Sequence, residues 1–274
     1  MRQVLGKEYN VFSSDSFINL KIQRIKAGLS TRDMDTDDVS YIALMPQLIK
    51  ADLVPMNMAD VMRARLESVK CNKPRQKKFW LNNSFNTIDG VAYYKGKVKI
   101  VHDAQALREV DRYTELRDGA LILTPKQYRA LEGEELSRSD LKKIGININK
   151  WLTKSGVNLY KWLTKSEVKS NPIWQALARD NNLLSEYADL VFAEVKQRYN
   201  AEEMQVCNDN YAMRICLYLG SEQENPMMRD WFVDSLDDRS DVGGNSPLYH
   251  SARLVGVRAE GASQKETLDE KVIN

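Results

Sequence analysis

A six-residue segment that combines lysine with tryptophan occurs twice in this sequence. Lys150-Trp-Leu-Thr-Lys-Ser and Lys161-Trp-Leu-Thr-Lys-Ser are identical and start eleven residues apart. Between Arg138 and Lys169 the chain carries eight basic residues and only two acidic ones. Lysines can neutralise the phosphates of a nucleic acid, and exposed aromatic rings can stack on its unpaired bases. The segment therefore supplies five candidate nucleic-acid-binding residues, Trp151, Lys154, Lys161, Trp162 and Lys165.

The repeat also has a purely structural interpretation. Eleven residues turn an α-helix through about 1,100°, roughly 20° more than three turns, so both tryptophans would lie on nearly the same helix face. Gly156 weakens a helix that continues through the join, and Thr164-Lys-Ser-Glu167 is a capping box at which a new helix can begin instead. A tolerated duplication of this kind would place one tryptophan in the core and its copy on the surface.

A second basic cluster is KCNKPRQKKFW, residues 70–80. It carries five basic residues up to position 78 and ends in two aromatic residues. Because it lies where a helical pattern gives way to a β pattern, a loop could expose it to a polyanion. The candidate residues are Lys73, Arg75, Lys77 and Lys78. The alternative interpretation is an ordinary solvated face, which is what most basic runs are.

The third candidate site is the segment 237–251, which we expect to be a loop. Its carboxylates and its histidine surround Gly243-Gly244, and loops beside rigid elements often hold binding or catalytic residues. His250 could act as an acid or base near neutral pH, with Asp237 and Asp241 as candidate partners. The same residue types are typical of a flexible surface turn, so a structural role is the alternative.

Several classes of protein lack their usual signatures here. The sequence has no GxGxxG, GxxxxGK[ST] or GxSxG motif, which removes the usual support for nucleotide binding and for hydrolase activity. His102 and His250 form no zinc-ligand spacing, so neither a metal nor another cofactor is expected. The three cysteines are widely spaced and do not indicate a disulfide framework. With no apolar run of roughly 18 residues and no secretory signal pattern, we expect a cytoplasmic protein in a reducing compartment, without a membrane span.

Charge is distributed unevenly along the chain. The net charge is only +2, but residues 1–179 contain 31 basic and 20 acidic residues, whereas residues 180–274 contain 9 basic and 18 acidic ones. The first part therefore carries +11 and the second −9. Such an imbalance favours an anionic partner for the basic part, or head-to-tail pairing between copies of the chain.

Hydrophobic periodicity indicates which elements would position these residues. The first seventy residues are expected to be helical, with one helix ending at Gly28, one beginning at Asp37 or Asp38, and one capped by Asn57. Alternation in residues 91–101, around Lys95-Gly96, then predicts a β-hairpin.

Further along the chain, helices are expected to dominate again. GALIL, ending at Leu123, predicts a strand, and the capping box that starts at Thr124 predicts a helix. Residues 137–200 are expected to be helical, including a helix that starts at Asn171-Pro172 and an amphipathic one over 182–199. The last elements are predicted as a strand in YAMRICLYLG, a helix from Asn225-Pro226 and a strand in ARLVGV.

These elements predict an α+β fold, or a mixed α/β one. We expect a helical N-terminal region over 1–75 and a small α/β unit over 76–145. Residues 146–258 would hold a helical segment and a C-terminal β-α-β unit, which can form one domain with the preceding unit. Residues 259–274 are expected to be a polar tail.

The function we predict from these patterns is binding of nucleic acid, mostly without sequence specificity, through a basic surface interleaved with aromatic residues. Two alternatives stay open. One is a self-assembling structural protein, a homo-oligomer that pairs its oppositely charged halves. The other is an enzyme with its site in the segment 237–251. No signature of sequence-specific nucleic-acid recognition occurs.

Overall fold

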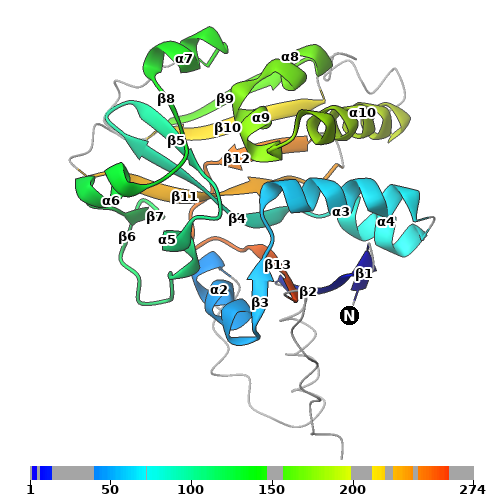
Figure 1. The fold of residues 1–274 in the computed structure, drawn as a ribbon, viewed down its shortest axis with the longest axis horizontal. Coiled ribbons are helices and arrows are strands. Elements are labelled where there is room, and N and C mark those ends of the chain that lie inside the picture. Colours follow the sequence, from blue (N-terminus) through cyan, green and yellow to red (C-terminus); the bar gives the residue numbers. More distant parts are fainter. Residues whose placement is uncertain are drawn as a thin grey trace, which may run out of the picture.

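The computed structural model describes residues 2–4, 7–13, 40–71, 73–146, 157–198, 212–219, 225–236 and 240–258. These residues form an α+β structure in which helices pack on a mixed β-sheet (Figure 1). The sheet contains strands from each of the three regions predicted from the sequence, 1–75, 76–145 and 146–258. The predicted helix that ends at Gly28 and the predicted tail over 259–274 lie outside the described residues.

Eight strands form the main path of the sheet. In spatial order they are β1 (Arg2–Val4), β2 (Lys7–Ser13), β13 (Arg253–Arg258), β4 (Phe85–Tyr94), β11 (Met227–Val233), β12 (Ser240–Gly244), β10 (Met213–Leu219) and β9 (Val157–Leu163). The pairs β10–β12 and β13–β4 are parallel and the other neighbours on the path are antiparallel.

Five short strands extend this path. The strand β3 (Leu53–Pro55) pairs with β13, and β5 (Lys97–Val101) pairs with β4 and with β8 (Glu134–Leu136). The strand β7 (Ala120–Ile122) pairs with β11 and with β6 (Leu116–Arg117).

One face of the sheet carries a layer of five helices. They are α3 (Met58–Lys70), α4 (Pro74–Leu81), α8 (Lys165–Ser170), α9 (Pro172–Ala178) and α10 (Asn181–Arg198). Their apolar side chains share one core with every second residue of β10, namely Met213, Ile215 and Leu217. We refer to this side of the sheet as the helical face.

The described helices cover the opposite face over only part of its width. Three helices, α2 (Tyr41–Lys50), α5 (Gln105–Arg108) and α6 (Pro125–Ala130), share a second core with β4, β11 and β13. Neighbouring residues of β13 belong to different cores, Leu254 to the second and Val255 to the first, as expected for a strand covered on both sides. The short helix α7 (Arg138–Lys143) lies next to β8.

Several local predictions are confirmed. The β4–β5 hairpin turns at Lys95 and Gly96, whose φ angles of 47° and 80° suit a two-residue hairpin turn. Thr124 and Thr164 each form a full capping box, at the starts of α6 and α8. Asn57 caps α3, and the predicted amphipathic helix is α10.

Other predictions of secondary structure are wrong. Residues 2–4 and 7–13 are strands in a region expected to be helical, and Asn225-Pro226 precedes the strand β11 instead of a helix. The repeat's second copy runs through strand β9 before α8 begins, so Trp162 lies on a strand. The segment 237–251, expected to be a loop, contains the strand β12. Strand pairing outweighs the local signal in these segments, and apart from β1, which pairs with the adjacent β2, each strand pairs with a segment further away in the sequence.

Candidate functional site

The half of the sheet formed by β12, β10 and β9 has one face on which the described residues place no helix. Because side chains alternate along a strand, this face carries the residues that lie between the core positions. Cross-strand pairs align them: Trp162 lies opposite Arg214, and Arg214 opposite Asp241. We refer to the surface formed by Asn158, Tyr160, Trp162, Arg214, Cys216, Tyr218 and Asp241 as the open face.

Arg214 is the centre of the open face. Its guanidinium carbon lies 4.7 Å from the centroid of the Tyr160 ring and 4.9 Å from that of Trp162. Asp241, which is buried, accepts a short hydrogen bond from the guanidinium. The aromatic rings and the carboxylate together hold the arginine in one position, and the carboxylate balances its charge.

Gly243 and Cys216 lie beside each other on neighbouring strands at the open face. Gly243 lies opposite both Cys216 and Phe232, and a Cβ atom at position 243 would meet the Phe232 ring at 2.3 Å. Burial, together with the charge of Asp241, raises the pKa of the Cys216 thiol to about 12. Cys216 therefore stays protonated at neutral pH and does not act as a nucleophile.

The border of the open face is also aromatic. Arg229 places its guanidinium carbon 3.9 Å from the centroid of the Tyr218 ring and donates hydrogen bonds to the carbonyl oxygens of Asn245 and Asp118. Tyr160 keeps 51% of its surface exposed, and Tyr249 also keeps 51%. The face thus offers aromatic rings to solvent beside arginines that are already held in place.

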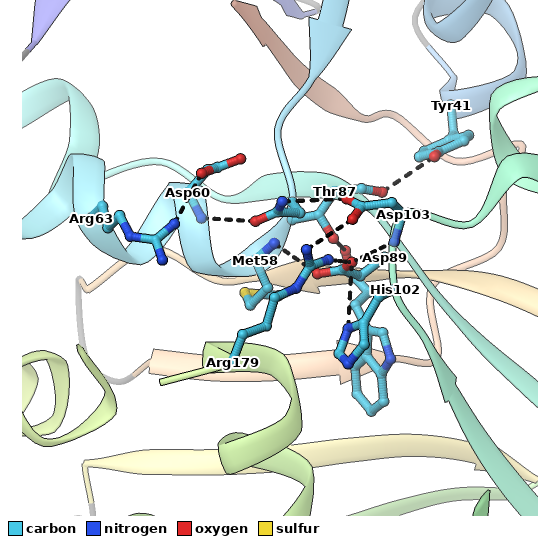
Figure 2. A network of polar contacts seen from close by, with 11 residues as sticks. Tyr41, Met58, Asp60, Arg63, Thr87, Asp89, His102, Asp103 and Arg179 are labelled. Atoms are coloured by element: carbon cyan, nitrogen blue, oxygen red, sulfur yellow. Dashed lines mark hydrogen bonds and ion pairs between the residues drawn. The ribbon is translucent and has the colours of Figure 1, made fainter. Parts of the chain in front are cut away.

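A separate polar cluster surrounds Asp89 in β4 (Figure 2). The buried carboxylate accepts hydrogen bonds from the backbone N–H groups of Met58 at 2.8 Å and Asp103 at 3.0 Å, and from the guanidinium of Arg179 at 2.6 Å. Arg179 also donates to the Asp103 carboxylate at 2.8 Å, and Nδ1 of His102 lies 4.0 Å from Asp89. One carboxylate thereby connects the first turn of α3, the segment after β5 and the residue after α9.

This cluster has a structural role, because Arg179 lies between the carboxylates of Asp89 and Asp103 and pairs with both. Burial alone would raise the pKa of Asp103, but the hydrogen bond and charge of Arg179 outweigh it and hold that pKa below its ordinary value. Arg179 has a left-handed backbone with φ 59°, which ends α9. Within the described ranges, no three His, Cys, Asp or Glu side chains lie together as ligands of a metal ion would.

The structure separates the residues predicted from the repeat. Trp162 lies on the open face, whereas Lys161 extends to the helical face and its Nζ lies 3.6 Å from Glu167. Lys165 pairs with Asp189 of α10 at 2.5 Å. Trp151 and Lys154 lie outside the described residues.

The second predicted cluster forms most of α4, in the helical layer. Lys77 pairs with Glu194 of α10 at 2.7 Å, whereas Lys73, Arg75 and Lys78 are exposed. Trp80 of this cluster is fully buried, and Phe79, which is partly buried, packs edge-on against it at 5.3 Å. The basic residues of α4 and the ring of Trp162 therefore lie on different sides of the sheet.

The third predicted site is divided in a different way. Asp241 is a buried strand residue whose carboxylate binds Arg214. His250 is exposed and its ring packs edge-on against Tyr249 at 5.0 Å. Asp237 lies outside the described residues.

Sequence reasoning missed Arg214 and Tyr218, and it noted Tyr160 only as an aromatic residue among the lysines of 138–169, not as a candidate binding residue. The signal for Arg214 and Tyr218 was present, because the alternation in YAMRICLYLG places them opposite the apolar residues of that strand. No local signal shows that Tyr160 lies on the neighbouring strand, since its segment has the spacing of a helix.

None of the helices among the described residues is long and apolar enough to cross a membrane.

Comparison with known proteins gives information on the fold alone. No family model and no curated protein matches the sequence. One solved structure, described as "Accommodation of massive sequence variation in Nanoarchaeota by the C-type lectin fold", aligns with 93% of this chain and 100% of its own, with a TM-score of 0.56 and 14% sequence identity. The chain is therefore similar in fold to a protein with the C-type lectin fold.

Proposed function

We propose that this protein is a binding protein that recognises another protein through its open face. The observation that carries this proposal is the position of Arg214, held between Tyr160 and Trp162 and anchored by Asp241 on a part of the sheet that no described helix covers. Tyrosine, tryptophan and arginine are the residues that most often dominate the binding energy of protein interfaces.

The geometry favours a protein partner for two reasons. The side chains are already fixed by their mutual contacts, so little conformational entropy is lost when a partner covers them. The charge of Arg214 is balanced by Asp241, so the face attracts neutral and polar surfaces as well as charged ones. Among the described residues, nucleic acid suits this face less well, because Lys161 extends to the other side of the sheet and Arg214 is already paired with Asp241.

The structural neighbour supports a scaffold of this kind. That protein is described as accommodating massive sequence variation on the C-type lectin fold. A fold held together by backbone pairing and two buried cores can present different side chains on an outer face without losing its structure. We extend this property to the open face of the present chain, where Asn158 and Tyr160 are exposed.

The proposal can be tested without knowing the natural partner. Peptides would be selected from a phage-displayed library of random 12-residue sequences against the immobilised protein, and each peptide's affinity measured for single variants. We expect Tyr160→Ala and Trp162→Ala to weaken most selected peptides by about tenfold or more, which is typical of central interface residues. Tyr113→Ala is the matched control, because Tyr113 is 87% exposed on another part of the molecule.

The expected pattern requires that the variants remain folded, which circular dichroism and the melting temperature would show. If the selected peptides bind Tyr160→Ala and Trp162→Ala as tightly as the unsubstituted protein, the open face is not the binding surface. A second copy of the chain is one partner to examine directly. Light scattering that shows self-association of the unsubstituted protein, lost in Trp162→Ala, would identify the protein as its own partner.

A further inference from the structure

Tertiary contacts bring together two basic segments that are more than one hundred residues apart in the sequence. The helix α4 carries Arg75, Lys77 and Lys78, with Lys73 at its N-cap, and the last turn of α10 carries Lys196 and Arg198. Their junction is marked by Glu194 of α10, which pairs with Lys77 at 2.7 Å and lies 3.9 Å from Arg198. In Figure 1, α4 lies at the same end of the helical layer as the C-terminus of α10. We refer to these six basic residues as the cationic corner.

The charge of the cationic corner is only partly balanced. Glu194 is the one carboxylate of these two segments and is 7% exposed, so it is enclosed by the cations that it pairs with. Lys73, Arg75, Lys78 and Lys196 are exposed and form no ion pair with other residues that the structure describes. A rigid surface with four outward cations attracts a polyanion whose charges are regularly spaced.

We infer that the cationic corner binds the phosphate backbone of double-stranded nucleic acid, without reading its sequence. This inference is independent of the proposed function, which concerns the opposite face of the sheet. Phosphate contacts from Lys and Arg side chains position a duplex, and they supply most of the affinity of non-specific binding.

The packing of the aromatic residues of α4 explains why a duplex is the expected form. Binding of single strands relies on exposed rings that stack with bases. In α4 the Trp80 and Phe79 rings instead pack with Phe85, at centroid distances of 5.0 and 5.5 Å, and Trp80 is fully buried. The exposed side chains here include the cations Lys73, Arg75 and Lys78, and a duplex offers them the denser array of phosphates.

The same observation argues against a membrane surface as the partner. A helix that lies on a bilayer inserts large apolar side chains between the headgroups. The large apolar side chains exposed among the described residues are Val54, Tyr113, Tyr160 and Tyr249, and none of these lies on α4 or α10.

The test measures the anisotropy of a fluorescein-labelled 20-base-pair duplex with the full-length protein between 50 and 300 mM NaCl. With about four to six phosphates neutralised, the logarithm of the association constant should fall against log salt with a slope of about −4 to −5. The combined variant Lys73→Ala, Arg75→Ala and Lys78→Ala should make this slope less negative by about 3 and leave the melting temperature unchanged. Its matched control, Arg108→Ala, Lys126→Ala and Arg129→Ala, removes the same charge from α5 and α6 and should bind as the unsubstituted protein does.

Several results would overturn the inference. They are negligible binding of the duplex at 50 mM salt, an equal loss in the control variant, or an unchanged slope in the α4 variant. Tighter binding of a single strand of the same length, or of vesicles rich in phosphatidylserine, would assign the corner to a different ligand. Trp162→Ala should bind the duplex normally, so failure of this inference and failure of the open-face proposal are separately visible.

Discussion

A buried carboxyl group makes the stability of this protein depend on pH in a specific way. Asp230 lies in β11, where the register with β4 shifts, and only 1% of it is exposed. Burial raises its pKa to about 7, although the side chain of Asn86 donates a hydrogen bond to its carboxyl group at 2.8 Å. The folded protein therefore holds this proton at pH values where the unfolded chain releases it.

The size of the effect follows from the two pKa values. The difference between about 7 in the folded protein and the ordinary value of 3.8 corresponds to about 4 kcal/mol in the free energy of unfolding. Because the folded state binds more protons between these values, stability should fall as pH rises from about 4 to about 7 and then level off. Asp230→Asn is neutral throughout, and so lacks this component of the pH dependence.

Urea denaturation of both proteins between pH 4 and pH 8 would measure the effect, since the contributions of all other groups cancel in the difference. We expect Asp230→Asn to gain stability relative to the unsubstituted protein as pH rises, by up to about 4 kcal/mol at pH 8. Asp52→Asn, at an exposed position, is the control and should show a flat difference. A flat difference for Asp230→Asn as well, or one that shrinks with rising pH, would refute the reasoning.

Two further predictions concern buried groups of the helical face and the open face. Arg65 is fully buried and donates hydrogen bonds to the carbonyl oxygens of Trp80, Asn83 and Asp234. Arg65→Met should therefore lower the free energy of unfolding, measured by urea denaturation, by about 3–5 kcal/mol. A loss below about 1 kcal/mol would contradict this role. Cys216, with a pKa of about 12, should resist alkylation by iodoacetamide at pH 8 in the folded protein, as followed by mass spectrometry, and react only after unfolding. Modification of Cys216 as fast as that of Cys71, which is only partly buried, would show that the open face does not shield its thiol.

Much of the secondary structure could be predicted because its signals are local. The capping boxes at Thr124 and Thr164 join side chains and backbone groups only three residues apart. The turn of the β4–β5 hairpin depends on the conformations of Lys95 and Gly96 themselves. Such features form from neighbouring residues, whatever the rest of the chain does, so a pattern of a few letters is sufficient to predict them.

The candidate sites were less predictable because charge and aromatic content do not show where a side chain faces. The basic residues of α4 were recognised from the sequence, but Trp80 beside them is fully buried and Phe79 is partly buried. Lys165 was a candidate for binding phosphate, and its charge is instead matched by Asp189. Whether a cation is paired depends on what a distant helix brings near it.

The amino-acid sequence alone therefore determined the α+β class, the positions of its main caps and turns, and the excess of positive charge before residue 180. Only the tertiary structure decided that residues 157–163 form a strand and that Arg214 lies between the rings of two residues from that strand. The carboxylate that anchors this arginine comes from a position 27 residues away in the sequence. Such contacts depend on strand pairing and burial, which act between residues that are far apart in the chain.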